Sequence, residues 1–134
     1  MKIIRHKFTI LDIRRPSQSN INEDLQWFGS SLGLFSLRDK DRSCFRIFIE
    51  LLKSAKADTP LSSDELAEKL NLSRGTIIFH INKLTSTGIV KTENRRYMLR
   101  VDNLKDLIEE LESDITETVD NLKNVARKID ERIR

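Results

Sequence analysis

Residues 62–90 read SSDELAEKLNLSRGTIIFHINKLTSTGIV, and this stretch decides the fold class. Ser62 and Glu65 have the spacing of a capping box, in which two side chains satisfy free backbone amides at the start of a helix. Leu66, Ala67 and Leu70 give that helix a narrow apolar stripe. Asn71-Leu72 then predicts a tight turn. The stretch therefore begins with a short helix and a turn that leads into a second helix.

The second helix is predicted over residues 73–87, with Ser73 as its cap and Gly88 as its C-terminal stop. At 100° per residue its side chains divide into two faces. The core face contains Ile77, Ile81 and Leu84. The opposite face contains Gly75, Phe79, Asn82 and Ser86, with Thr76, Ile78 and Lys83 beside them. A helix of this kind can pack on its own core while it presents the other face to the major groove of DNA.

Three side chains on this helix allow more than one interpretation. Phe79 lies opposite the core, so it either touches thymine methyl groups or is covered by another part of the protein. Asn82 could bind adenine or be solvated. His80 lies near the edge of the core face, where a half-buried structural role is favoured over a DNA contact or a pH switch.

Residues 89–101 follow Gly88 and predict a hairpin with a basic tip. The order of helix, turn, helix and hairpin is that of a winged helix-turn-helix, in which the hairpin is the wing. Arg95 and Arg96 near the tip are expected to contact phosphates or the minor groove. From Ser73 to Arg100 there are 6 basic residues, namely Arg74, Lys83, Lys91, Arg95, Arg96 and Arg100, and 1 acidic residue, Glu93. This local positive charge favours a polyanionic partner.

The preceding segment is less regular. Residues 3–13 predict a short strand or an extended arm, and Asn20 or Asn22 can cap a short helix that contains Trp27, expected to be buried against the main domain. A stronger helix is predicted from Asp39 or Asp41 to about Ala57. Its apolar residues, Phe45 and Phe48 among them, cover nearly every side, so we expect both the N-terminal segment and a second subunit to cover it.

Residues 102–134 contain no Gly or Pro and carry apolar residues at helical spacing. A heptad register also fits Ile108, Leu111, Ile115, Thr118, Leu122, Val125 and Ile129. The stripe could pack on the chain's own domain, but a helix of about 45 Å is longer than so small a domain can cover. Self-association is favoured. The residues expected to form the dimer are Phe45, Phe48, Leu104, Ile108, Leu111, Ile115, Leu122 and Ile129.

Composition excludes several other classes. The chain has 134 residues, a net charge of +3, only 4 Gly and 2 Pro, and no apolar run that could span a bilayer. No signal peptide is expected at the N-terminus. Cys44 is the single cysteine, which favours a reducing cytoplasm and excludes a thiolate metal cage. Besides this cysteine the chain has only two histidines, His6 and His80, so no metal, cofactor or catalytic site is expected.

Several motifs together carry a family resemblance: residues 63–73, Thr76-Ile77, His80-Ile81, Leu84 and Gly88-Ile89-Val90. They resemble the winged helix-turn-helix of ArsR-like transcriptional regulators of bacteria and archaea, over about residues 43–101. The resemblance implies a homodimer whose interface is built by the first and last helices. It implies DNA contacts by Arg74, Gly75, Thr76, Ile78, Phe79, Asn82 and Lys83, with Arg95 and Arg96 in the wing. The Cys-x-Cys pair of metal-sensing members is absent, so metal sensing is not expected.

The sequence thus predicts a mainly α protein in three parts: an N-terminal arm and short helix (1–38), a winged helix-turn-helix (39–101) and a dimerisation helix (102–134). Ser73 is counted with the DNA-contacting residues because it lies at the start of the second helix. The expected function is sequence-specific binding of double-stranded DNA by a symmetric dimer, with recognition helices about 34 Å apart. The alternatives are a winged-helix module that binds proteins and a non-specific, chromatin-type DNA binder.

Overall fold

The computed structural model describes residues 4–35 and 42–134. Over these residues the chain is mostly helical, with one antiparallel hairpin and a long C-terminal helix, which confirms the predicted fold class. The elements are α1 (Ile21–Ser31), α2 (Ser43–Lys56), α3 (Ser63–Leu70), α4 (Arg74–Ser86), β1 (Val90–Glu93), β2 (Arg96–Leu99) and α5 (Leu104–Ile133). Asp39 and Asp41, the predicted starts of the second of these helices, lie outside the described residues.

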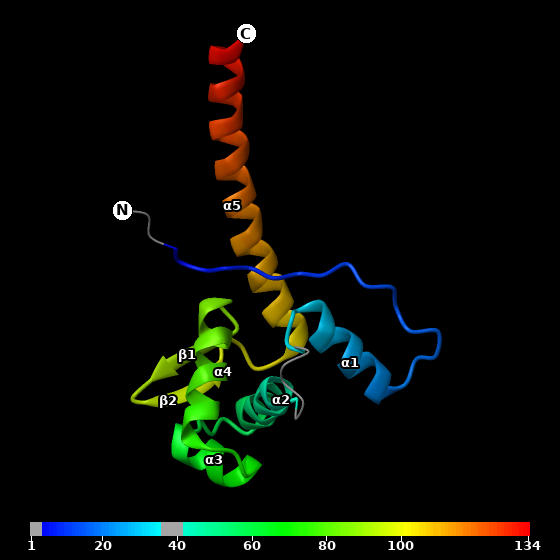
Figure 1. Ribbon diagram of the computed structural model, residues 1–134, viewed down its shortest axis with the longest axis vertical. Helices are drawn as coiled ribbons and strands as arrows, with labels where there is room; N and C mark the ends of the chain where they lie inside the picture. Colours follow the sequence, from blue (N-terminus) through cyan, green and yellow to red (C-terminus); the bar gives the residue numbers. More distant parts are fainter. Residues whose placement is uncertain (1–3, 36–41) are drawn as a thin grey trace.

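The core forms around α2, which packs against α3, α4 and β2 (Figure 1). Ile47, Phe48 and Leu51 of α2 have no exposed surface. They meet Leu66 of α3 and the inward face of α4, which contributes Ile77, Ile81 and Leu84. Burial of each such side chain stabilises the fold by about 1.5–3 kcal/mol. The helix-turn-helix therefore has a complete core within one chain.

The predicted helix ends are confirmed in detail. At the start of α3, Ser62 Oγ accepts from the Glu65 amide at 3.1 Å, and the Glu65 carboxylate accepts from the Ser62 amide at 3.2 Å. Ser73 Oγ accepts from the Thr76 amide at the start of α4. Gly88 follows α4 with a φ of +82°, a conformation in which a β-carbon would be strained.

The hairpin turns over two residues only. Glu93 pairs with Arg96, and Asn94 and Arg95 between them have φ values of 51° and 63°. Positive φ at both central residues is the geometry of a type I′ turn, whose twist matches that of the strands. An isolated bridge between Leu61 and Tyr97 ties the hairpin to the loop before α3. The wing is therefore attached to the helix pair at its base.

The N-terminal segment is an extended arm and forms no strand over residues 4–20. Its backbone is tied to the domain by the Lys7 amide, which donates to Ser86 O of α4, and by the Leu11 amide, which donates to Ser31 O of α1. Trp27 of α1 donates to Ile13 O at 2.9 Å, so its indole nitrogen is bound by the arm. Our expectation that Trp27 is buried in the main domain is wrong, because this side chain is only half-buried.

The helix α5 leaves the domain and projects beyond it, with the arm crossing its lower part (Figure 1). Leu107 and Leu111 are buried against the domain, whereas every residue from Thr116 onward is exposed. At about 1.5 Å per residue the exposed part is more than 25 Å long. The stripe therefore splits into a proximal part that packs on its own domain and a distal part that the described chain leaves uncovered.

Candidate nucleic-acid interface

The outward face of α4 is mostly uncovered by the described chain; the arm reaches its C-terminal end, where the Lys7 amide donates to Ser86 O. Gly75, Phe79, Asn82 and Ser86 are exposed. The inward face is buried and includes His80 as well as the three predicted aliphatic residues. His80 is therefore more deeply buried than the half-buried position expected from the sequence. The division of α4 into a core face and a free face is as predicted.

Two residues on the free face contribute little to the folded chain, apart from an edge-on ring contact of Phe79 with His80. Phe79 is 70% exposed, so the possibility that another part of the described chain covers it is wrong. A β-carbon added at Gly75 would meet no atom within 4 Å. Glycine inside a helix costs about 1 kcal/mol relative to alanine. Both residues are therefore unfavourable or neutral for the fold, and both lie on the face that would enter a groove.

The start of α4 carries hydroxyls and one cation. Ser73 Oγ and Thr76 Oγ1 lie 2.8 Å apart, so the cap residue and its neighbour form one polar cluster. Arg74 lies beside them and approaches Asp64 at 3.7 Å, with both side chains mostly exposed. Such an exposed pair contributes little to stability and is easily exchanged for a phosphate. Helix N-termini favour anions because their first amides have no helical acceptor.

Not every predicted contact residue on α4 is equally free. Lys83 Nζ donates to Gly33 O at 2.9 Å and is half-buried, which ties α4 to the end of α1. Ile78 is also half-buried. No local pattern could predict the Lys83 contact, because its acceptor is a backbone carbonyl 50 residues away.

The two arginines of the wing have different surroundings. Arg95 is exposed at the turn. Arg96 Nη1 bonds the Glu65 carboxylate and donates to Pro60 O at 3.2 Å. Hydrogen bonds from Ser62, together with the charge of Arg96, lower the pKa of the Glu65 carboxyl. Arg96 therefore holds the wing against α3, and Arg95 is the cation that points away from the domain.

Arg100, which the predicted site did not include, links the wing to α5. Its guanidinium pairs with Glu110 at 3.0 Å and with Asp114. The hydrogen bond from Arg100 lowers the pKa of Asp114, and the same bond raises the pKa of Arg100. These partners are on another element, so local sequence patterns could not reveal them.

The predicted dimer residues are also in different positions. Phe48 and Leu111 are buried within the chain and have almost no surface to offer a second subunit. The expectation that these two residues contact the second subunit directly is therefore corrected. Phe45 and Leu104 are partly buried and pack on the core. Ile115 is half-buried. The exposed apolar residues of α5 include Ile108, Leu122 and Ile129, and also Val119, Val125 and Ile133.

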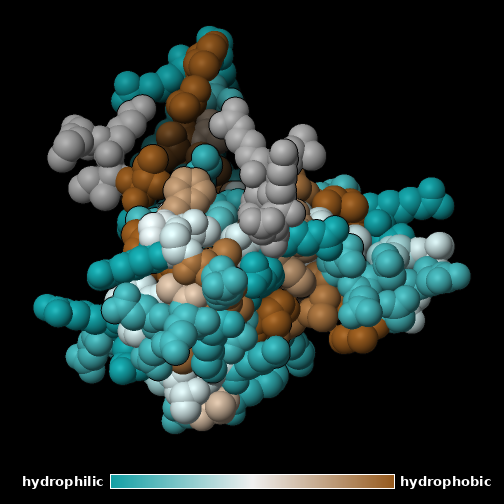
Figure 2. All heavy atoms as spheres, turned by 60° about the horizontal axis from the view of Figure 1, so that its bottom comes forward, coloured by the Kyte–Doolittle hydropathy of each residue, from teal (hydrophilic) through white to brown (hydrophobic). Residues whose placement is uncertain are grey.

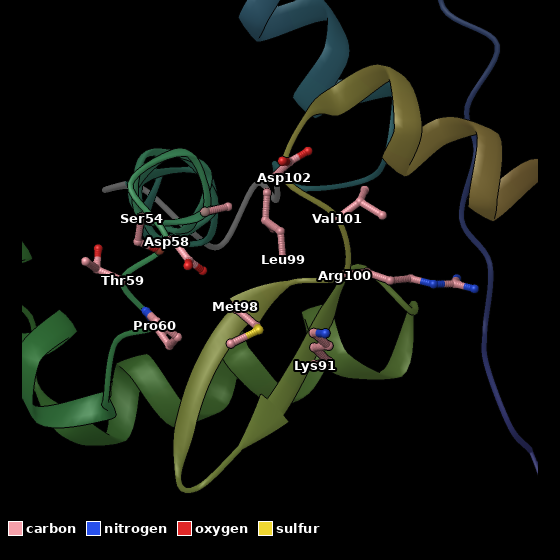
Figure 3. Close-up of a pocket in the computed structure, with 11 residues that line it drawn as sticks. Ser54, Asp58, Thr59, Pro60, Lys91, Met98, Leu99, Arg100, Val101 and Asp102 are labelled. Carbon is pink, nitrogen blue, oxygen red and sulfur yellow. The ribbon is translucent and has the colours of Figure 1, made fainter.

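A hollow of about 170 Å³ lies between the end of α2, the base of the wing and the start of α5 (Figure 3). Ser54, Asp58, Pro60, Met98 and Asp102 are among its lining residues. Figure 3 shows the Arg100 side chain directed away from it, toward α5. In the part of the chain that the structure describes, no group of three or more histidine, cysteine, aspartate or glutamate residues could hold a metal ion. We assign no ligand to this hollow.

The fold and this surface define the class of protein as a winged helix-turn-helix. Residues 48–98 match a family model described as an HTH domain, a span that runs from α2 to the end of the wing. The match supports a helix-turn-helix DNA-binding family without singling out the ArsR-like regulators. No curated protein and no solved structure matches the chain. Among the described helices, none is both long and apolar enough to cross a membrane.

Proposed function

We propose that the chain is a transcriptional regulator that binds specific double-stranded DNA sequences as a homodimer. Helix α4 enters the major groove, and the wing contacts flanking backbone or the minor groove. The observation that carries the proposal is the free face of α4, where Gly75 leaves open space and Phe79 is exposed. The matched helix-turn-helix segment supports the same reading.

Each contact has a physical role in this proposal. The open surface at Gly75 allows the helix to approach the groove closely. Phe79 contacts thymine methyl groups and Asn82 reads a base edge, while Arg74 and the hydroxyls of Ser73 and Thr76 bind phosphates. Arg95 supplies a cation from the wing tip. The protein acts by binding, so no catalysis is proposed, and a regulator of this kind works in the cytoplasm, where the DNA is.

The first test is a titration of duplex affinity against salt. A dimer with two cations per subunit on phosphates, Arg74 and Arg95, loses affinity by a factor on the order of 10² between about 50 and 200 mM salt. Absence of binding to any duplex at the lower salt concentration contradicts the proposal. Competition between a selected duplex and random duplex separates a specific regulator from a chromatin-type binder.

Gly75→Ala gives a sharper test because the new methyl group meets nothing in the free chain. We expect this variant to be more stable by about 0.5–1 kcal/mol, since alanine favours helices, and to bind duplex at least tenfold more weakly. Lys56→Ala, which removes an exposed cation at the end of α2, is the matched surface control and should bind as the wild type does. If Gly75→Ala binds duplex as tightly as the wild type does, α4 does not enter the groove.

The exposure of Phe79 also fits a second candidate, a module that binds a protein partner through α4. Contacts of that kind are mainly apolar, so partner binding should depend little on salt. Weak, salt-insensitive duplex binding together with a partner that is lost in Phe79→Ala would favour this candidate.

A further inference from the structure

The distal part of α5 presents an apolar stripe that the described chain leaves exposed. Figure 2 shows a hydrophobic band along the projecting helix. The band contains Val119, Leu122, Val125, Ile129 and Ile133, all of them exposed, with Leu122 at 65%. Residues at such heptad-like spacing form a seam when two helices pair. This seam can be buried only against a second surface. The charges along α5 indicate what that surface is.

Charge is unevenly distributed along this helix. Residues 113–120 carry Asp114, Glu117 and Asp120 and no basic side chain, a net of −3. Residues 127–134 carry Arg127, Lys128, Arg132 and Arg134 against Asp130 and Glu131, a net of +2. Arg100 pairs with Asp114, and Arg5 and His6 of the arm line the same hollow as Asp114 and Glu117, so these groups offset part of the negative charge. One end of the exposed segment is thus acidic and the other is basic.

We propose that α5 pairs with α5 of a second copy in antiparallel orientation, centred between Lys123 and Asn124. This pairing places residues 113–120 of each chain at the level of residues 127–134 of the other, so the acidic end of each helix lies beside the basic end of its partner. Parallel pairing would place each group beside its own copy, where like charges repel. The inference rests on the proposed dimeric function and specifies how the two copies are joined.

The same register aligns the apolar seam. Leu122 of one chain meets Val125 of the other, and Ile129 meets Thr118. Every residue in these layers is exposed in the single chain, so the pairing displaces nothing from the core. A register shifted further toward the domain would use Leu111, which is already buried.

A hollow at the crossing of the arm and α5 supports this orientation. It measures about 370 Å³ and is lined by Ile4, Phe8, Asp114, Glu117 and Thr118, together with Arg5, His6 and Arg100. In the antiparallel register it faces residues 129–133 of the second copy. Ile133 can then enter beside Ile4 and Phe8, and Arg132 can approach Glu117. In a parallel pair this hollow would face the same hollow of the other chain.

The arrangement changes the expected DNA site. The two Leu107 residues, where α5 meets each domain, would lie about 50 Å apart along the coil. Helices α3 and α4 lie on the far side of that junction from the C-terminal end of α5 (Figure 1). The recognition helices are therefore further apart than one helical turn of DNA. We expect half-sites about two turns, or roughly 68 Å, apart.

The test uses the full chain with single spin labels at Ser113→Cys or Arg134→Cys, two exposed positions on the outer side of the seam. Cys44 is buried, and the unsubstituted chain should take up no label. In the antiparallel dimer each matched pair of labels is about 31 Å apart along the axis, whereas the mixed pair lies at one level. After subunit exchange, pulsed electron paramagnetic resonance should therefore show a new, shorter distance in the mixture.

Two results would overturn the inference: matched pairs shorter than the mixed pair, which means parallel pairing, or no distance between chains at all. Duplex binding is measured on the same samples. If the label distances show parallel pairing and specific duplex binding is retained, only the antiparallel arrangement is overturned. If the unsubstituted protein binds no duplex at all, the proposed function is overturned.

A charge exchange provides an independent readout. Glu117→Lys with Asp120→Lys should weaken the dimer severalfold at low salt, because residues 113–120 then carry a net charge of +1 and lie beside the basic end of the partner helix. Adding Lys128→Glu and Arg132→Glu to the same chain exchanges the two ends and should restore the dimer to within about twofold at the same salt. In a parallel dimer the four changes would leave like charges together, so failure of the restoration contradicts the proposal.

Discussion

The helix-turn-helix core and the distal half of α5 use apolar residues in opposite ways. In α2, Ile47, Phe48 and Leu51 are completely buried in a core to which α1, α3, α4, the hairpin and the start of α5 contribute. In α5, Leu122 and Ile133 are largely exposed, and no other described segment reaches them. The first region has its core within one chain, whereas the second leaves its apolar stripe exposed. The described chain therefore contains a domain with a closed core and, in the dimer that we propose, a pairing unit, the distal part of α5.

The largest expected effect is in the core. Phe48→Ala should reduce the free energy of unfolding by about 3–5 kcal/mol, since it removes a buried ring and leaves a cavity. Chemical denaturation of the wild type and the variant measures the difference. A loss below about 1 kcal/mol would mean that the core is not as closed as the structure shows.

The next effect concerns the pairing unit. Leu122→Asn with Ile129→Asn should weaken the dimer at least 100-fold, because each buried aliphatic side chain contributes about 1.5–3 kcal/mol. Sedimentation equilibrium measures the change. Circular dichroism should show that the domain still folds, since both residues are exposed in the single chain. Unchanged association would exclude this stripe from the interface.

A smaller effect is expected at the capping box of α3. Ser62→Ala should cost about 1 kcal/mol, because the Glu65 amide loses its acceptor. The lowered pKa of Glu65 adds a pH dependence with a defined sign. Its stabilisation is complete above the unfolded value, about 4.3, and is lost as pH falls through the lower folded value.

Glu65→Gln is the matched control for this pH dependence, because glutamine can retain the capping bond but has no carboxyl to titrate. Unfolding curves at neutral and acid pH should show a smaller acid-side loss in Glu65→Gln than in the wild type. Equal losses in the two proteins would assign the acid sensitivity to other carboxyl groups.

The last change in stability is predicted at the wing. Arg95→Gly should stabilise the hairpin by about 1 kcal/mol, since arginine has a positive φ of 63° that glycine adopts without strain. Duplex affinity should nevertheless fall severalfold, because the exposed cation is lost. Thermal melting and a binding titration measure the two quantities. An affinity that stays the same would mean that the wing tip does not contact DNA.

The sequence predicted what depends on near neighbours. Capping pairs such as Ser62 and Glu65, the turn at Gly88 and the two faces of α4 follow from spacing alone, and the structure confirms them. Contacts between distant elements were not predictable. Lys83 binds Gly33 O, and Arg96 binds Glu65, because the fold brings together groups that no local pattern relates.

In the long helix α5, too, local spacing was predictable and contacts with distant elements were not. Its period predicted one continuous stripe, and Ile108 was assigned to it rather than Leu107. In the structure Leu107 is buried on the domain and Ile108 is partly exposed. Both residues lie at helical spacing from Leu111. Only the position of the domain decides between them, and that position depends on tertiary contacts, among them the Arg100 pairs with α5.

The central claim is that a symmetric dimer reads DNA through α4, and selection of bound duplexes from a random pool tests it most directly. The account predicts enrichment of an inverted repeat whose two halves are read by equivalent helices, which Gly75→Ala binds at least tenfold more weakly. A pool with no enriched sequence, or with a single unrepeated site bound equally well by Gly75→Ala, would contradict it.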